Sequence, residues 1–150
     1  MSQENGKTLK DAEGDVFRGL EVVEDSCGSV TKMLGETIEQ VASGVDIYSY
    51  KQPIGVCAGI TPFNFPAMIP LWMWPLALTC GNTFVLKPSE KTPNTAMILG
   101  RLGQEAGLPD GVLNIIHGAH ESVNFLCDNP AVRGISFVGS TNVGKYIHSR

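Results

Sequence analysis

The sequence lacks the features that mark secreted, membrane-spanning and nucleic-acid-binding proteins. Its start, MSQENGKTLK, has no apolar core for a signal peptide and is neither Arg-rich nor acid-poor, as a transit peptide would be. The longest apolar run, 66–80, contains three prolines and is about 15 residues long, short of the ~20 that span a membrane. The 11 Lys and Arg against 15 Asp and Glu give a net charge of −4, without a basic block. We therefore expect no targeting signal in this chain, and neither a membrane nor nucleic acid as a partner.

The sequence also lacks a recognisable metal site. Its four cysteines are widely separated: Cys27, Cys57, Cys80 and Cys127. No two of them form a C-x-x-C pair, so we expect no metal and free thiols in a reducing compartment. His117 and His120 in HGAH have a spacing that could fit a metal, but no third ligand is evident. They are interpreted as loop histidines.

The first regular element that the sequence contains is a long amphipathic helix. Apolar residues recur at intervals of three and four: Leu9, Ala12, Val16, Leu20, Val23, Cys27, Val30 and Leu34. Thr8 and Asp11 form a capping-box start, and Gly35 supplies a stop. We expect the apolar stripe to face the core.

A short connection follows this helix. GETIEQVASG (35–44) is expected as a polar link, and the alternation in DIYSY (46–50) predicts a strand. We therefore expect residues 1–54 to be a helix and linking strand that lead into an α/β domain over 55–150.

After residue 55, short apolar strands alternate with helices. Strands are expected at 55–60, 82–87, 112–116 and 134–138. Helices are expected at 66–77, from Thr92 as the cap to Gly107, at 120–126, and after Ser140. The pattern predicts the α/β class, with a Rossmann-like, doubly wound parallel sheet. Ligands of such sheets bind beyond the carboxyl ends of the strands, so the segments after the strands are the candidate site.

TPFN, after the first strand, places Asn64 in an apolar and stiffened setting. Pro62 and Pro66 restrict the backbone on both sides and could aim the amide. A buried amide without a partner costs roughly 1–3 kcal/mol. Asn64 is therefore either bonded to its own loop or held ready as an oxyanion donor, and this stretch leaves both interpretations open.

KPSE and GSTNVGK follow two further strands. Lys87 can meet a hydroxyl or phosphate, and Glu90 is an acceptor for paired ribose hydroxyls; a solvated loop with an ordinary ion pair is the alternative. Ser140 stands where a strand passes into a helix, a place that favours phosphate. GSTNVGK is close to a P-loop, but Tyr146 occupies the position where Mg²⁺ coordination needs Ser or Thr.

Four segments together resemble the NAD(P)-dependent aldehyde dehydrogenase superfamily: TPFNFP, LKPSE, EAGLPDGVLNII and SFVGST. From Glu4 onward the chain is most similar to the CoA-acylating branch that acts on methylmalonate and malonate semialdehydes. The resemblance implies a parent enzyme that makes propionyl- or acetyl-CoA and CO₂, with NAD as cofactor and CoA as co-substrate. A hydrolytic aldehyde dehydrogenase of another branch and an inactive truncated product remain alternatives.

The resemblance also implies roles for single residues. Asn64 would donate its amide to the substrate oxyanion, and the backbone around Thr61 and Phe63 would lie along the nicotinamide ribose. Lys87 and Glu90 would hold the adenosine ribose hydroxyls.

Two further positions complete the cofactor contacts that the resemblance implies. Lys91 stands where this branch often has Arg, so a contact there would be weaker or lose its bidentate form. Ser140 would meet the pyrophosphate.

The family pattern is longer than this chain, and its nucleophilic Cys lies downstream of SFVGST. We therefore expect a partial NAD-binding domain without the catalytic domain, as in a fragment, and no dehydrogenase activity by this chain alone. The resemblance implies a parent that forms a homo-oligomer such as a tetramer. It implies a mitochondrial parent in a eukaryote and a cytoplasmic one in a bacterium.

Overall fold

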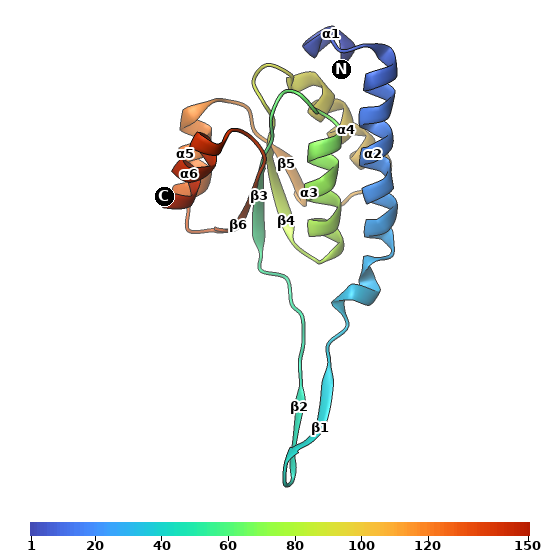
Figure 1. Cartoon of the computed structure of the whole chain (residues 1–150), viewed down its shortest axis with the longest axis vertical. Helices are drawn as coiled ribbons and strands as arrows, with labels where there is room; N and C mark the ends of the chain where they lie inside the picture. The colour runs from blue at the N-terminus through green and yellow to red at the C-terminus, as the bar shows by residue number, and fades with distance from the viewer.

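The computed structural model describes residues 1–150, and a four-stranded parallel sheet forms its centre (Figure 1). The strands are β3 (Val56–Ile60), β4 (Thr83–Lys87), β5 (Leu113–Ile115) and β6 (Val132–Phe137). They lie in the order β5-β4-β3-β6, so the chain runs outward from β3 and then crosses to its other side. This order confirms the predicted doubly wound, Rossmann-like sheet. The reversal next to β3 is where such sheets bind ligands.

Helices cover both faces of the sheet. They are α3 (Met68–Thr79), α4 (Pro93–Glu105), α5 (His120–Asp128) and α6 (Thr141–Ser149). Figure 1 shows α5 and α6 on the opposite side of the sheet from α3. Neighbouring strand residues point to opposite faces, so Phe84 and Leu86 join the core beneath α3 while Ala58 and Ile60 join the core beneath α5. None of the helices has the length and apolar character that crossing a membrane requires.

The long N-terminal helix ends earlier than the sequence pattern predicts. After α1 (Ser2–Asn5), α2 runs from Leu9 to Cys27, and η1 (Ser29–Met33) is a 3-10 helix. The predicted start is correct, since Thr8 Oγ1 accepts a hydrogen bond from the Asp11 main-chain N–H at 3.2 Å. The predicted end at residue 34 is wrong. The Ser29 hydroxyl donates to the Asp25 carbonyl at 3.0 Å. This bond competes with the main-chain N–H that would continue the α-helix, and the chain follows with the tighter 3-10 helix η1.

The apolar stripe of α2 is not the buried face. Leu9 and Leu20 are 75% and 49% exposed, whereas Asp15, Gly19 and Ser26 are buried. A Cβ on Gly19 would lie 2.6 Å from Leu71 Cδ1 of α3. The expectation that the stripe faces the core is therefore wrong. Small residues on the other face let α2 and α3 approach closely.

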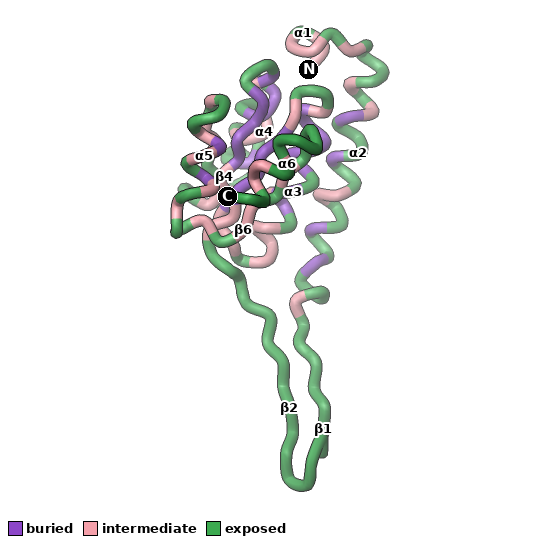
Figure 2. The backbone as a smooth tube through the Cα atoms, turned by 60° about the vertical axis from the view of Figure 1, so that its left-hand side comes forward, coloured by how far each residue is buried: buried purple, intermediate pink, exposed green.

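The segment between α2 and β3 is a hairpin rather than a polar link and a single strand. β1 (Thr37–Ala42) and β2 (Val45–Tyr48) pair antiparallel, and Gly44 has a φ of 73° in the tight turn between them. Figure 2 shows this hairpin extending from the body of the molecule, exposed along its length. The prediction of a link over 35–44 fails because a left-handed glycine in a short turn allows the two segments to pair.

The start of α4 is capped by a distant residue. Thr92 occupies the predicted cap position, but its hydroxyl is buried without a hydrogen-bond partner. Instead, the Glu4 carboxylate accepts the main-chain N–H groups of Asn94 and Thr95 at 2.6 and 3.1 Å, and the Thr95 hydroxyl at 2.6 Å. The predicted Thr92 side-chain cap is therefore wrong. A carboxylate there satisfies free N–H groups and the positive end of the helix dipole.

Candidate functional site

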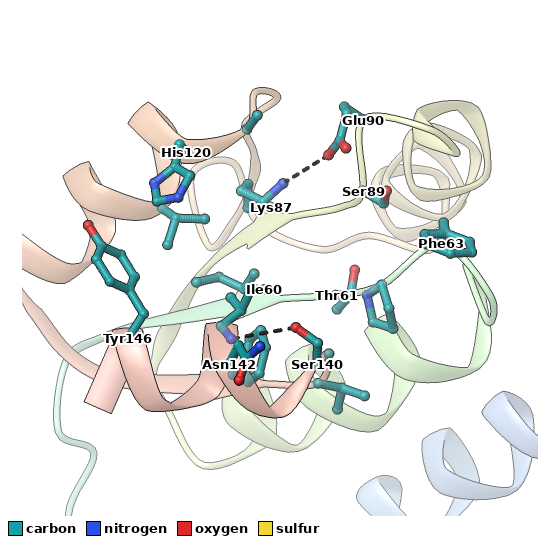
Figure 3. A pocket seen from close by; sticks show the side chains of 17 residues that line it. Ile60, Thr61, Phe63, Lys87, Ser89, Glu90, His120, Ser140, Asn142 and Tyr146 are labelled. Atoms are coloured by element: carbon teal, nitrogen blue, oxygen red, sulfur yellow. Dashed lines mark hydrogen bonds and ion pairs between the residues drawn. The ribbon is translucent and has the colours of Figure 1, made fainter. Parts of the chain in front are cut away.

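A cavity of about 510 Å³ opens at the carboxyl ends of β3, β4 and β6 (Figure 3). Five of the predicted site residues line it: Thr61, Phe63, Lys87, Glu90 and Ser140. These residues come from three segments that each directly follow or end a strand. The parallel sheet therefore brings them together, as the sequence pattern predicts.

Lys87 is buried, and two hydrogen bonds fix the orientation of its side chain. It is the last residue of β4, is 3% exposed, and donates from Nζ to the main-chain oxygens of Pro88 and Gly118, each at 2.8 Å. Burial lowers the pKa of Lys87, and the charge of Glu90 opposes that shift. An ammonium group has three protons, so one remains for a ligand beyond the two carbonyls.

Glu90 lies at the rim of the cavity. Its side chain is 55% exposed, and Oε2 is 4.0 Å from Lys87 Nζ. A pair at this distance with one exposed partner contributes little to folding, about 0–1 kcal/mol. The carboxylate is therefore available to accept hydrogen bonds from hydroxyl groups of a ligand.

Ser140 begins α6 on the side of the cavity across from Lys87 and Glu90 (Figure 3). Its Oγ accepts a long hydrogen bond of 3.5 Å from the Val143 main-chain N–H. A Cβ on the neighbouring Gly139 would lie 2.5 Å from Phe137 Cζ, so a larger residue there would require the Phe137 ring to move. The N–H groups at this helix start, together with the helix dipole, suit an anionic group.

His120 and Tyr146 form an aromatic wall that the sequence did not reveal as part of the site. Their ring centroids are 5.3 Å apart in an edge-to-face arrangement, and the Tyr146 hydroxyl donates to Asn124 Oδ1 at 2.7 Å. His117 instead has Nε2 3.4 Å from Met97 Sδ. No group of three or more His, Cys, Asp or Glu could hold a metal ion. The position of His120 in HGAH, after a strand, was the available signal.

Two predicted residues do not line the cavity. Asn64 is exposed, so the expectation of a buried amide is wrong; the loop protrudes past the end of β3, and Phe63 in it is 48% exposed. The Asn64 side chain makes no hydrogen bond, so the first of the two interpretations, a bond to its own loop, is wrong. Lys91 Nζ lies 4.6 Å from the centroid of the Phe63 ring, at cation–π distance. The oxyanion role of Asn64 and the cofactor role of Lys91 stay predictions.

Comparison with known proteins identifies the family of the chain. The model of the aldehyde dehydrogenase family matches residues 1–150. A probable acylating, mitochondrial methylmalonate-semialdehyde/malonate-semialdehyde dehydrogenase of Dictyostelium discoideum is 67% identical over the whole chain. The chain spans 28% of that relative's length.

Solved structures agree. A putative methylmalonate-semialdehyde dehydrogenase of Sinorhizobium meliloti, complexed with NAD, has a TM-score of 0.96 and 47% identity, and the match covers 99% of this chain and 30% of that one. Methylmalonate-semialdehyde dehydrogenase of Oceanimonas doudoroffii has a TM-score of 0.95 and 51% identity, covering 97% and 30%. The family model, the similar sequence and the similar structures each cover nearly the whole chain. The chain therefore belongs to the aldehyde dehydrogenase family.

Proposed function

We propose that this chain supplies the NAD-binding part of a CoA-acylating methylmalonate- and malonate-semialdehyde dehydrogenase. The observation that carries the proposal is the cavity in which Lys87, Glu90 and Ser140 converge. The relatives' names and the NAD complex of the Sinorhizobium meliloti protein support it. The reaction would convert the semialdehyde, NAD and CoA into propionyl- or acetyl-CoA, CO₂ and NADH.

The residues of the cavity fit a dinucleotide. Lys87 offers one N–H and Glu90 an acceptor, which together suit the two hydroxyls of a ribose. The start of α6 at Ser140 suits a phosphate, and apolar side chains such as Val123 and Val143 offer a dry wall for a base. NAD, when bound, supplies the acceptor for the substrate's hydride.

Thr61, Phe63, Asn64 and Lys91 complete the proposed site. Thr61 and Phe63 line the cavity, and their backbone would contact the nicotinamide half. Asn64 would donate its free amide to the oxyanion of the semialdehyde adduct, because an oriented amide stabilises charge as it develops. Lys91, held over the Phe63 ring, would reach the adenosine end.

None of the four cysteines is proposed as the nucleophile. Burial raises the pKa of the Cys57 and Cys127 thiols, which disfavours the reactive thiolate. Neither Cys27 nor Cys80 lines the cavity that holds Lys87. Cys27 lines a separate hollow. The nucleophile would therefore come from elsewhere in a complete enzyme.

Titration of the 150-residue chain with NAD⁺ by calorimetry tests the proposal. We expect Lys87→Met and Glu90→Gln each to weaken binding about tenfold, which corresponds to about 1.4 kcal/mol. Glu21→Gln, on the exposed side of α2, is the matched control and should bind NAD⁺ as the unsubstituted 150-residue chain does. Binding that both cavity variants leave unchanged would contradict the assignment.

The CoA-acylating and hydrolytic alternatives share this cavity and differ in the second half of the reaction. Product analysis of the complete enzyme separates them, since the acylating enzyme requires CoA and releases an acyl-CoA. The name of the Dictyostelium discoideum relative, which specifies an acylating enzyme, favours acylation. By the same similarity we propose a homo-oligomeric parent, mitochondrial in a eukaryote and cytoplasmic in a bacterium.

A further inference from the structure

The loop that carries Asn64 is held from a distant part of the chain. Lys7 Nζ donates to the Asn64 main-chain oxygen at 2.8 Å and to Asp15 Oδ2 at 2.9 Å. The same ammonium lies 4.6 Å from the centroid of the Phe65 ring. One side chain therefore contacts helix α2 and two residues of the loop after β3.

Asp15 gives Lys7 a fixed point of attachment. Its side chain is fully buried, and its second oxygen, Oδ1, accepts the Met68 main-chain N–H at the start of α3 at 2.6 Å. The Lys7 side chain is only 14% exposed, so it has little freedom to turn elsewhere. The Asp15 carboxylate is buried and accepts two hydrogen bonds, so it holds the Lys7 ammonium group from one side. The remaining protons of that group therefore point to the other side, where the Asn64 oxygen lies.

Asn64 depends on this contact more than its neighbours do. The hydrogen bond from Lys7 is the only one that Asn64 makes, whereas Thr61 N–H donates to the Lys87 oxygen and Phe65 O accepts from Ile69. Asn5 Nδ2 adds a long bond of 3.5 Å to the Phe63 oxygen from the same N-terminal segment. The loop is thus anchored at both ends by its own chain and in the middle by residues 5 and 7.

We propose that Lys7 is a positioning residue: it holds the Phe63–Phe65 loop in place and so positions the main chain from which the unpaired Asn64 amide projects. The consequence for catalysis rests on the proposed function, in which Asn64 is the oxyanion donor. The loop-holding part rests on the contacts alone. A purely structural role would limit Lys7 to neutralising Asp15.

The loop itself can be observed without any ligand. We expect ¹⁵N relaxation to give order parameters of about 0.85 for residues 63–65 in the unsubstituted chain and below about 0.6 in Lys7→Met, with the sheet unchanged. Lys7→Arg, which keeps the charge and donors, should restore order. Lys10→Met, on the exposed surface of α2, should have no effect. An ordered loop in Lys7→Met would overturn the proposal.

Removing Lys7 leaves Asp15 as an unpaired buried charge, so the single variant could unfold. A neutral background avoids this, because Asp15→Asn keeps an oxygen that can accept the Met68 N–H. In that background Lys7 still reaches the Asn64 oxygen. We expect Asp15→Asn to keep the loop ordered and the double variant Asp15→Asn with Lys7→Met to lose that order. Equal order in both would overturn the proposal.

Ligand affinities separate this inference from the proposed function. We expect Lys7→Met to weaken NAD⁺ binding about fivefold to tenfold and ADP binding less than twofold, because ADP lacks the nicotinamide half that would meet the loop. Equal losses for both ligands together with a lower melting temperature would indicate a merely structural role. If the unsubstituted chain binds neither NAD⁺ nor ADP, the proposed function fails, while the relaxation data still decide the role of Lys7.

Discussion

At the scale of single residues, the site combines a buried cation that keeps one donor free with an exposed amide whose side chain has no hydrogen-bond partner. Lys87 is bonded to two carbonyls and keeps one proton free, whereas Asn64 has a free side chain and a bonded main chain. A polar group without a partner is costly unless a ligand or solvent meets it. Residues with unpaired groups are therefore where binding is expected.

Thr61 offers a direct test of this balance. It is 4% exposed in the wall of the cavity, and its hydroxyl has no hydrogen-bond partner. We expect Thr61→Val, which replaces the hydroxyl by a methyl group of similar size, to raise the free energy of unfolding by about 1 kcal/mol. Thermal melting should show a rise of about 2–4 °C.

Thr8→Val is the contrasting control for Thr61. Its hydroxyl oxygen accepts the Asp11 N–H and caps α2, so the same substitution should destabilise the chain by about 1 kcal/mol. A decrease in stability for Thr61→Val would show that its hydroxyl is paired in solution.

At the scale of elements, close approach explains which face of α2 is buried. Gly19→Ala should destabilise, because the new Cβ would meet the buried Leu71 side chain. Overpacking costs about 1–3 kcal/mol, more than the gain in helix propensity of about 1 kcal/mol. Chemical denaturation measures the change.

Gly14 provides the matched control in the same helix. A Cβ on Gly14 meets nothing within 4 Å, so Gly14→Ala should stabilise by about 0.5–1 kcal/mol. If both alanine variants gained stability, the close contact between α2 and α3 would be incorrect.

The cap on α4 predicts a dependence on pH. Burial opposes ionisation of Glu4, but the bonds from the Thr95 hydroxyl and from the Asn94 and Thr95 N–H groups outweigh it and lower its pKa. A lowered carboxyl pKa adds stability that is present above the unfolded value of about 4.3 and is lost as the pH falls through the folded value. Glu4→Gln should therefore cost about 1 kcal/mol at pH 7.

The difference between the parent and Glu4→Gln should shrink as the pH falls below about 4. Urea unfolding at a series of pH values measures it. Glu13→Gln, on the exposed side of α2, should show no such trend. A constant difference across the series would mean that the Glu4 charge does not contribute.

At the scale of the whole molecule, the cavity lies at the carboxyl ends of β3, β4 and β6. The β1–β2 hairpin extends from the body (Figures 1 and 2). The chain covers 28% of the length of the Dictyostelium discoideum relative. The proposed cofactor contacts lie within the described residues, whereas no cysteine here suits the nucleophile. The division of the chain at residue 54 into a lead-in and a domain stays a prediction.

This arrangement predicts binding without turnover. The purified 150-residue chain should bind NAD⁺ but produce no NADH from propanal, NAD⁺ and CoA, because the proposed reaction needs a thiolate nucleophile before hydride transfer. Absorbance at the NADH band measures the product. Sustained turnover by this chain would contradict the absence of a nucleophile among its cysteines.

The sequence by itself determined the alternation of strands and helices, the doubly wound sheet and the edge where Lys87, Glu90 and Ser140 meet. These features follow from local patterns, because short apolar strands joined by helices have few alternatives and the carboxyl ends of parallel strands share one edge. It could not identify His120 and Tyr146 as neighbours, since they come from different helices.

Only the tertiary structure decided which face of α2 is buried, which residue caps α4 and what holds the Asn64 loop. Each decision rests on contacts between distant positions: Asp15 with Met68, Glu4 with Asn94, and Lys7 with Asn64. An apolar stripe is buried only when another surface covers it. A residue at the N-cap position accepts the free N–H groups of its helix only when no better acceptor from another part of the chain binds them. Both conditions depend on how the elements pack, which local patterns in the sequence do not contain.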